Sequence, residues 1–349
     1  MNASKSRFIE MEQNVKRLTP DELVQLVSAI FVTNGMSPSN AAAVAKVVME
    51  AERDGSFSHG LFRIPAYVTT LQSGHVDGAA VPIVVDAAPS VVKVDASNGF
   101  AQPAIEAGRH LLLQKARKTG LASMAIHNSH HFAALWPDVE TFAEEGMIAL
   151  AFVNSRMRIA PWDAPRKLIG TNPMAFACPR ADGPPLVWDQ ASSVMAQGAV
   201  LIAAREGREL DEGVLLDAEG QPTTDANALQ AGGALRSFGT HKGSSIALMV
   251  EILAAALTGA NFGFEDTESE LHGSATQNAG ELILVIDPVT FGSSNLAQRV
   301  STLLSHLQSG GVTRFPSESR HRARAENSAG IPVSATSHAQ LIALAGKGA

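Results

Sequence analysis

The sequence of 349 residues contains only one cysteine, Cys178, and this scarcity excludes several kinds of site. A single thiol forms neither an intramolecular disulfide nor a multi-cysteine zinc site, and such usage fits a reducing cytoplasm. We therefore expect a cytoplasmic protein in which Cys178 is a small, buried, apolar side chain.

Positive charge is also scarce, because 27 Lys and Arg residues stand against 34 Asp and Glu residues. The formal net charge is −7, whereas a nucleic-acid partner would require a basic face. We expect no DNA or RNA partner. A local basic cluster in the C-terminal tail is interpreted as a solvated helix face: Arg314, Arg320, His321, Arg322 and Arg324.

Long apolar runs are missing as well. The most apolar helical stretch, residues 246–257, is too short to span a bilayer and has Glu251 at its centre. The first 16 residues are charged and lack the apolar core of a signal peptide. We expect a buried helix at 246–257, no membrane partner and no export.

The length of the chain and its helix start signals indicate how it is organised. A chain of 349 residues is longer than the chains that usually fold around a single hydrophobic core, so we expect two lobes. The sequences Thr19-Pro20-Asp21-Glu22 and Ser37-Pro38 place an N-cap before a proline, which predicts helices to about residue 33 and over 41–52. Periodicity and turn residues predict helices at 64–71, 101–119, 133–145, 191–205, 245–258 and 295–309, strands at 83–86, 91–95, 121–126, 147–153, 186–189 and 281–286, a loop at 161–179 and a surface excursion at 207–237.

Three familiar fingerprints are absent from the sequence. No G-x-G-x-x-G follows a predicted strand, so a standard Rossmann domain is not supported. The P-loop spacing is missing, and no serine lies in the G-x-S-x-G context of a nucleophile elbow. His241 and Lys242 nevertheless open the predicted helix at 245–258, where a cation and free backbone amides favour a bound anion.

Three of the 11 histidines, His127, His130 and His131, lie within five residues. The predicted elements place them at a strand-to-helix turn, where α/β proteins commonly bind ligands. His127 and His131 would share a face only in a helix, and no H-E-x-x-H pattern or cysteine supports metal binding. We expect a ligand site without a metal.

Residues 53–63 concentrate polar side chains between two predicted helices. Ser58 and His59 fit either a local capping role or a site in which they act with a distant acid such as Asp189. In such a site the imidazole carries the proton and the acid fixes its tautomer. These residue types alone leave the reaction open.

Five motifs occur in the order found in the type 2 malate/L-lactate dehydrogenase family, which the chain resembles from about residue 18 to 333. They are Ser58-His59-Gly60-x-x-Arg63, Asn128-Ser129-x-His131-Phe132, Gly170-Thr171-Asn172-Pro173, Trp188-Asp189-x-Ala191-x-Ser193 and His241-Lys242-Gly243. Within that family, residues 130–138 are most similar to the Δ1-piperideine-2-carboxylate/Δ1-pyrroline-2-carboxylate reductases.

The resemblance implies an α/β (α+β) fold that binds NADP without a Rossmann domain. Its largely antiparallel sheet is flanked by helices, and a second lobe comes from both termini. On this basis residues 1–120 plus 311–349 form a helical substrate and dimerisation lobe, and residues 121–310 form the NADP-binding domain. A homodimer is expected.

The resemblance also implies roles for individual residues. Ser58, His59 and Asp189 match a catalytic relay in which Asp189 orients His59 as the general acid, and Arg63 matches the contact to the substrate carboxylate. His131 is a possible second proton donor. The cofactor-binding positions are His131, Phe132, Ala133, Ala134, Leu135, Ser155, Gly170, Thr171, Asn172, Asp189, Gln190, Ala191, His241, Lys242 and Arg299.

The reaction implied is NADPH-dependent reduction of the C=N bond of cyclic imino acids. The products are L-pipecolate and L-proline, and the cofactor is NADPH rather than NADH. Arg156 and Arg158 either favour the additional phosphate of NADPH or are solvated surface residues. The alternatives are a 2-hydroxy acid dehydrogenase acting on malate, lactate or ureidoglycolate, a binding protein that has lost catalysis, and a metal-dependent hydrolase.

Overall fold

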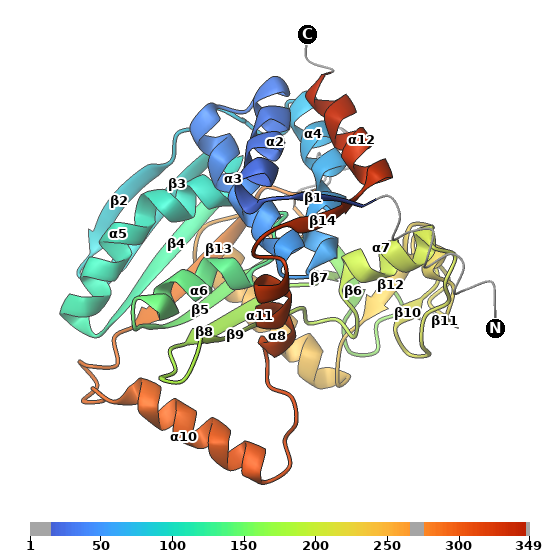
Figure 1. Ribbon diagram of the computed structural model, residues 1–349. Helices are drawn as coiled ribbons and strands as arrows, with labels where there is room; N and C mark the ends of the chain where they lie inside the picture. The colour runs from blue at the N-terminus through green and yellow to red at the C-terminus, as the bar shows by residue number, and fades with distance from the viewer. Residues whose placement is uncertain (1–14, 266–275, 347–349) are drawn as a thin grey trace.

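The computed structural model describes residues 15–265 and 276–346 (Figure 1). The start of the chain, where we expected no signal peptide, lies outside the described residues. The strands are β1 (Val15–Leu18), β2 (Ile83–Ala88), β3 (Val91–Phe100), β4 (Leu121–His130), β5 (Ile148–Val153), β6 (Met157–Ala160), β7 (Ile169–Gly170), β8 (Met174–Cys178), β9 (Leu186–Gln190), β10 (Leu215–Leu216), β11 (Pro222–Thr223), β12 (Ala234–Arg236), β13 (Ala279–Ile286) and β14 (Ile331–Ser334). The helices are α2 (Pro20–Thr33), α3 (Pro38–Arg53), α4 (Ile64–Gln72), α5 (Ala101–Thr119), α6 (Trp136–Glu144), α7 (Gln197–Arg205), α8 (His241–Glu251), α10 (Leu296–Ser309), α11 (Glu318–Glu326) and α12 (Ala335–Ala345).

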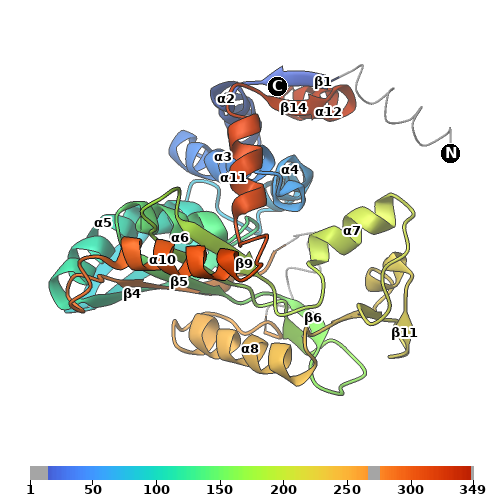
Figure 2. The same ribbon diagram turned by 60° about the horizontal axis from the view of Figure 1, so that its bottom comes forward.

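A seven-stranded sheet in the order β2-β3-β4-β13-β5-β8-β9 forms the centre of the molecule. Only the β3–β4 pair is parallel, so the expected, largely antiparallel sheet is confirmed. Side chains alternate along β4, because Met124 and Ile126 belong to the core under α5 and Ala125 to the core under α8. Helices α5 and α6 cover one face of this sheet and α8 covers the other (Figure 2). Cys178 of β8 is buried, as expected.

The second lobe is built from both ends of the described chain, as expected. Strand β1 pairs with β14, and α12 packs against α2 (Figure 1). The capping box that starts α2 is present, since Glu22 N donates to Thr19 Oγ1 at 3.2 Å and Thr19 N donates to Glu22 Oε2 at 2.8 Å. Leu23, Val27 and Phe31 of α2 are fully buried in this lobe.

A smaller sheet in the order β11-β10-β12-β6-β7 takes three short strands, β10, β11 and β12, from residues 207–237, which we expected to be a surface excursion. The expectation holds for the turns of this region, which are exposed, but is wrong for its strands, because Leu215 and Leu235 are fully buried and pack with Val200 of α7 in a core of their own. The apolar side chains on these very short strands are too few to show the alternation by which a strand is recognised.

Several predicted boundaries also differ from the structure. Strand β4 continues to His130 instead of ending at residue 126, and the predicted loop at 161–179 contains β8. Helix α7 starts at Gln197 rather than 191, because Ser192 Oγ donates to Asn172 O at 3.0 Å and holds the preceding segment against its neighbour. The predicted domain boundary after residue 120 falls between α5 and β4, which pack on each other, and β2 and β3 belong to the same sheet as β4.

The predicted helix at 245–258 is α8 followed by a π-helical turn over Ile252–Ala256. Val250 and Ala254 are fully buried against the sheet, although Leu248 and Ile252 on the opposite side are exposed. Among the helices of the described chain, none combines the length and the apolar character needed to cross a membrane.

Burial of His130 at the end of β4 predicts how stability depends on pH. The side chain is fully buried, its Nε2 lies 2.9 Å from Asn98 Oδ1, and burial together with His75 and Arg156 lowers its pKa to about 3. Between pH 6.5 and 3 the unfolded chain therefore binds a proton that the folded protein does not, so stability falls as the pH falls through this window.

We expect His130→Gln to flatten that dependence by up to about 1.4 kcal/mol per pH unit, the value for one proton. Urea unfolding at pH 7.5, 6 and 5 measures the change, with His110→Gln on the exposed side of α5 as the control. If the free energy of unfolding changes with pH equally in His130→Gln and in the unmodified protein, this account is wrong.

Candidate functional site

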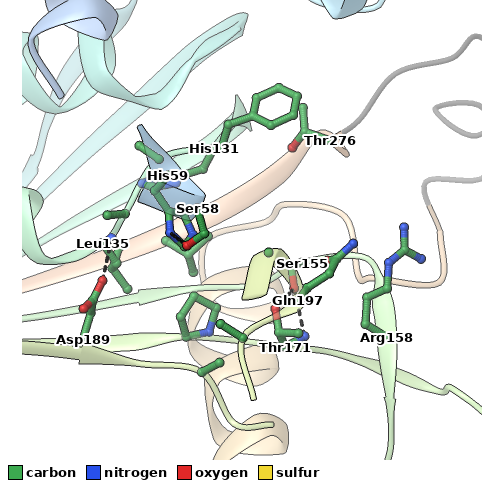
Figure 3. Close-up of a pocket in the computed structure, with 18 of the residues that line it drawn as sticks. Ser58, His59, His131, Leu135, Ser155, Arg158, Thr171, Asp189, Gln197 and Thr276 are labelled. Atoms are coloured by element: carbon green, nitrogen blue, oxygen red, sulfur yellow. Dashed lines mark hydrogen bonds between the residues drawn. The ribbon is translucent and has the colours of Figure 1, made fainter. Parts of the chain in front are cut away.

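A cavity of about 290 Å³ lies where the ends of β4 and β9 meet the turns between α3 and α4. Ser58, His59 and His131 lie together on one side of it, and Ser155, Thr171 and Arg158 lie on the other (Figure 3). Most residues named from the family resemblance line this cavity: Ser58, His59, Arg63, His131, Phe132, Ala133, Ala134, Leu135, Ser155, Thr171, Asp189, Gln190 and Ala191.

Ser58, His59 and Arg63 come from two short 3₁₀ turns that the buried Glu52 holds in place. Its carboxylate accepts a hydrogen bond from Leu61 N at 2.9 Å, and a Cβ on Gly60 would lie only 2.2 Å from the same oxygen. The same Cβ would lie 3.0 Å from Glu52 Cα, so glycine permits the close approach of this turn to α3. Ser58 Oγ lies 3.0 Å from His59 Nδ1, and Arg63 Nε donates to Ser58 O at 2.9 Å.

The electrostatic environment keeps His59 neutral. Burial lowers the pKa of its imidazole to about 3, and the neighbouring Arg63 and His131 act in the same direction. Burial also lowers the pKa of the Arg63 guanidinium. Among the described residues no carboxylate forms an ion pair with Arg63, so this side of the cavity presents an uncompensated positive charge.

The second imidazole of the cavity, His131, has a carboxylate partner. Its Nε2 lies 2.8 Å from Asp138 Oδ2, and both side chains are buried. Burial raises the pKa of Asp138, and the negative Asp189 adds to this shift, whereas the hydrogen bond between Asp138 and His131 opposes it. Sequence reasoning did not single out Asp138, because an acid in the first turn of a helix also fits a response to the helix dipole.

Asp189 makes different contacts from the ones expected. Its Oδ2 accepts hydrogen bonds from Leu135 N at 3.1 Å and Trp136 N at 3.3 Å, and its Oδ1 lies 3.0 Å from Arg320 Nη2. Within the described ranges no hydrogen bond joins Asp189 to His59, so the expectation that Asp189 orients His59 directly is wrong. Asp189 instead fixes the start of α6, and therefore the position of Asp138.

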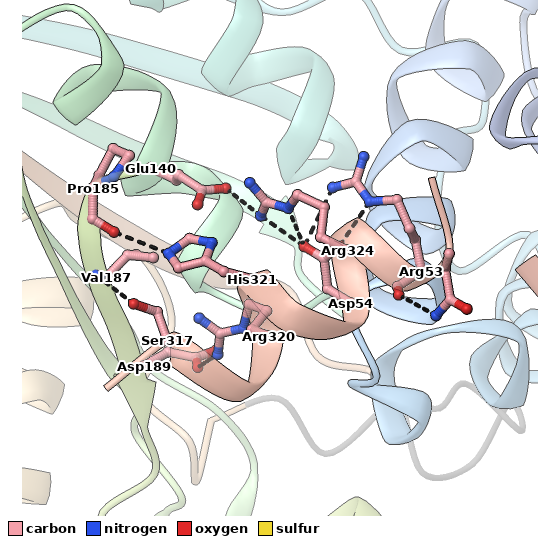
Figure 4. Close-up of polar contacts among 11 residues, drawn as sticks. Arg53, Asp54, Glu140, Pro185, Val187, Asp189, Ser317, Arg320, His321 and Arg324 are labelled. Carbon is pink, nitrogen blue, oxygen red and sulfur yellow. Dashed lines mark hydrogen bonds and ion pairs between the residues drawn. The ribbon is translucent and has the colours of Figure 1, made fainter. Parts of the chain in front are cut away.

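Helix α11 reinforces this arrangement (Figure 4). Arg324 Nη2 lies 2.6 Å from Asp54 Oδ2 and 2.7 Å from Glu140 Oε2, and the guanidinium groups of Arg320 and Arg324 both lie over the Trp136 ring. The expectation of a solvated basic face is therefore wrong for these two arginines. The carboxylates that bind them lie far away in sequence, and a charge cluster by itself does not reveal such partners.

The opposite wall combines hydroxyl groups and cations. Ser155 Oγ lies 3.1 Å from Thr171 Oγ1 and accepts a hydrogen bond from Thr171 N at 3.0 Å. Arg156 and Arg158 also line the cavity and are partly buried, and Arg156 Nη2 donates to Thr276 O at 2.6 Å. These two arginines are therefore part of the cavity wall and not solvated surface residues.

Five residues named from the resemblance lie outside the cavity lining: Gly170, Asn172, His241, Lys242 and Arg299. Gly170 and Asn172 lie directly behind it. A Cβ on Gly170 would lie 2.1 Å from Ser155 O, and the buried Asn172 donates to Glu251 Oε2 at 2.6 Å. His241, Lys242 and Arg299 are exposed, the first two at the start of α8 and the third on α10.

The sequence pattern of the malate/L-lactate dehydrogenase family matches residues 18–342, which is most of the chain. The chain belongs to this family. Membership of the malate/L-lactate dehydrogenase family confirms the expectation drawn from the five ordered motifs, and the matched range includes every residue of the cavity lining.

Three relatives of this chain bear on function. The Delta(1)-pyrroline-2-carboxylate/Delta(1)-piperideine-2-carboxylate reductase of Pseudomonas putida is 53% identical over 310 residues, covering 89% of this chain and 91% of the relative. The protein of the same name from Pseudomonas syringae pv. tomato is 48% identical over 96% of this chain and 98% of its own. The (2R)-3-sulfolactate dehydrogenase (NADP(+)) of Chromohalobacter salexigens is 41% identical over 87% of this chain and 91% of its own.

The fold of the family is confirmed by a solved structure. The crystal structure of delta1-piperideine-2-carboxylate reductase from Pseudomonas syringae pv. tomato has a TM-score of 0.92 with this chain at 48% identity. The similarity covers 94% of this chain and 99% of that one. A mixed α/β fold with helix-covered sheets is therefore common to both proteins.

The ion pairs of α11 predict a stability change that a surface arginine does not produce. Arg324→Ala should lower the free energy of unfolding by about 1–3 kcal/mol, because the fully buried Asp54 side chain would lose one of the two arginines that form ion pairs with it among the described residues. Arg322→Ala, at an exposed position on the same helix, is the matched control. Equal urea midpoints for the two variants would show that the network does not stabilise the fold.

Proposed function

We propose that the protein reduces the C=N bond of cyclic imino acids, converting Δ1-piperideine-2-carboxylate to L-pipecolate and Δ1-pyrroline-2-carboxylate to L-proline. The observation that carries this proposal is the uncompensated guanidinium of Arg63, which lies in one cavity with His59 and His131. A cyclic imino acid has a carboxylate next to its C=N bond, and a guanidinium binds a carboxylate through two parallel charge-assisted hydrogen bonds. The names of the two relatives at 53% and 48% identity support the same substrate class.

The proton donor that the geometry favours is His131. Asp138 occupies its Nε2, so Nδ1 remains for a proton that passes to the substrate nitrogen. His59 is neutral and bonded to Ser58, which suits this pair to positioning the substrate beside Arg63. In this proposal Asp138 and Asp189 position the donor, and Asp189 acts through the start of α6 instead of through His59.

The cofactor that we propose is NADPH, which supplies the hydride when it is bound. The residues present fit a phosphorylated nucleotide, because Arg156 and Arg158 place two cations beside the hydroxyl groups of Ser155 and Thr171. The name of the sulfolactate dehydrogenase relative includes NADP(+) and supports the same preference. The cofactor roles inferred for Phe132 to Leu135, Gly170, Asn172, Gln190, Ala191, His241, Lys242 and Arg299 remain part of this proposal.

We further propose a cytoplasmic homodimer. All six residues of the edge strand β2 are exposed, and Ile83, Val84 and Val85 present three adjacent apolar side chains. An exposed apolar edge strand is normally covered by another chain or element. The single cysteine is consistent with the cytoplasm.

A second candidate is a 2-hydroxy acid dehydrogenase. The sulfolactate dehydrogenase relative, at 41% identity, favours it, and reduction of a C=O bond needs the same carboxylate clamp and proton donor. The decisive experiment follows NADPH oxidation with the two cyclic imines, pyruvate, oxaloacetate and glyoxylate, and repeats each reaction with NADH. We expect the imines to react fastest and NADPH to be preferred over NADH. Turnover of the keto acids alone would contradict the imine proposal.

Three substitutions separate the roles of the cavity residues. His131→Ala should lower kcat by about 10²- to 10⁴-fold, the range for a general acid, with a smaller loss at low pH where solvent protonates the imine. Arg63→Ala should mainly raise KM, because it removes the carboxylate contact. His59→Ala should affect kcat less than His131→Ala; the reverse order would return the acid role to His59.

A further inference from the structure

Behind His131 lies a carboxyl group that has no role in the proposed reduction. Glu281 is on β13, in the middle of the seven-stranded sheet, where it pairs with Ile126 on β4 and Val153 on β5. Its side chain is fully buried, and among the described residues no group donates a hydrogen bond to either carboxylate oxygen. A buried ionised carboxylate without a partner is very costly, so this side chain retains a proton.

Glu281 belongs to a compact group with the proposed proton donor. One nitrogen or oxygen atom from each of His131, Asp138 and Glu281 lies within 4.8 Å of the other two. Among these three, only His131 lines the cavity. A small side-chain rotation or one water molecule is enough to connect Glu281 with Asp138 at such a separation.

The two carboxyl groups of Asp138 and Glu281 together carry at most one negative charge. Burial raises the pKa of Glu281 well above its usual value, and the nearby Asp138 acts in the same direction. Burial likewise raises the pKa of Asp138, with a contribution from Asp189. Two adjacent buried carboxyl groups do not ionise together, because each disfavours the charge of the other.

The remaining titratable neighbours lie on other elements. Tyr67 of α4 interacts with Asp138, and burial raises the pKa of this phenol above its usual value. On the cavity side, Arg63 and His59 face His131. A second cation beside Arg63 would be unfavourable, so a route that never forms a charged His131 has an electrostatic advantage.

We propose that Glu281 is a buried proton store that reloads His131 through Asp138 during the reaction. As the N–H bond at His131 Nδ1 breaks and a new N–H bond forms on the substrate, His131 Nε2 takes a proton from the Asp138 carboxyl group. Asp138 takes in turn the proton held by Glu281, which is left as a carboxylate. Protons entering from the cavity through His131 restore the group between turnovers. This proposal rests on the proposed reductase function, with His131 as the donor.

Proton inventories with Glu281→Gln test this proposal. We expect a plot of kcat against the D₂O fraction of the solvent to be curved for the unmodified enzyme, because several protons move in one step. Glu281→Gln keeps the shape of the side chain but holds no acidic proton, so its kcat should be about tenfold lower, with unchanged KM and a linear inventory. Glu50→Gln is the matched control, since burial on α3 also raises the pKa of Glu50, to about 7.

A second measurement needs no activity and does not depend on Glu281→Gln reaching full stability. Asp138 and Glu50 also hold protons near pH 7, so the measurement is the infrared difference spectrum between the unmodified protein and Glu281→Gln. That difference should contain one C=O stretch from a protonated carboxylic acid, which belongs to Glu281. Glu281→Asp should retain the band and part of the lost kcat.

Three results would overturn the proton store: no such band, a linear inventory in the unmodified enzyme, or a metal ion found in stoichiometric amount in the purified protein and required for activity. If the unmodified protein does not reduce the imines at all, the proposed function has failed. The infrared band then still decides whether Glu281 is protonated.

Discussion

The carboxylate of Asp189 is the contact on which the geometry of the cavity depends. One oxygen accepts the two backbone N–H groups that open α6, and the other binds Arg320 of α11. The free amides of a helix start favour a negative charge, and the guanidinium of Arg320 holds that charge in place. Because Asp138 lies in the first turn of α6, the same contact fixes the carboxylate that binds His131.

Two imidazoles in one cavity are made different by their neighbours. His59 lies beside a guanidinium and a hydroxyl group, so it stays neutral and forms polar contacts. His131 lies against the carboxyl group of Asp138, which can accept or return a proton at Nε2. The separation between substrate binding by Arg63 and proton transfer by His131 follows from these neighbours, since the two rings are chemically identical.

Local signals in the sequence predicted the parts of the fold that depend on local contacts. The capping box at Thr19 is an example, because its hydrogen bonds are satisfied within a few residues. The family resemblance predicted which segments form the cavity. Neither revealed the partner of Asp189 or the role of Asp138, because these contacts form only when α6 and α11 pack against β9. The burial of Arg324 was hidden for the same reason.

The order of the strands constrains how the chain acquires its structure. Strand β13 lies between β4 and β5 although it follows them by more than a hundred residues, and β1 finds its partner β14 close to the other end of the chain. Closing such long loops costs entropy before any contact compensates for it, and high contact order slows folding. During synthesis the central sheet therefore remains split until β13 has left the ribosome. Glu281, at the middle of that late strand, enters the interior in the step that completes the sheet.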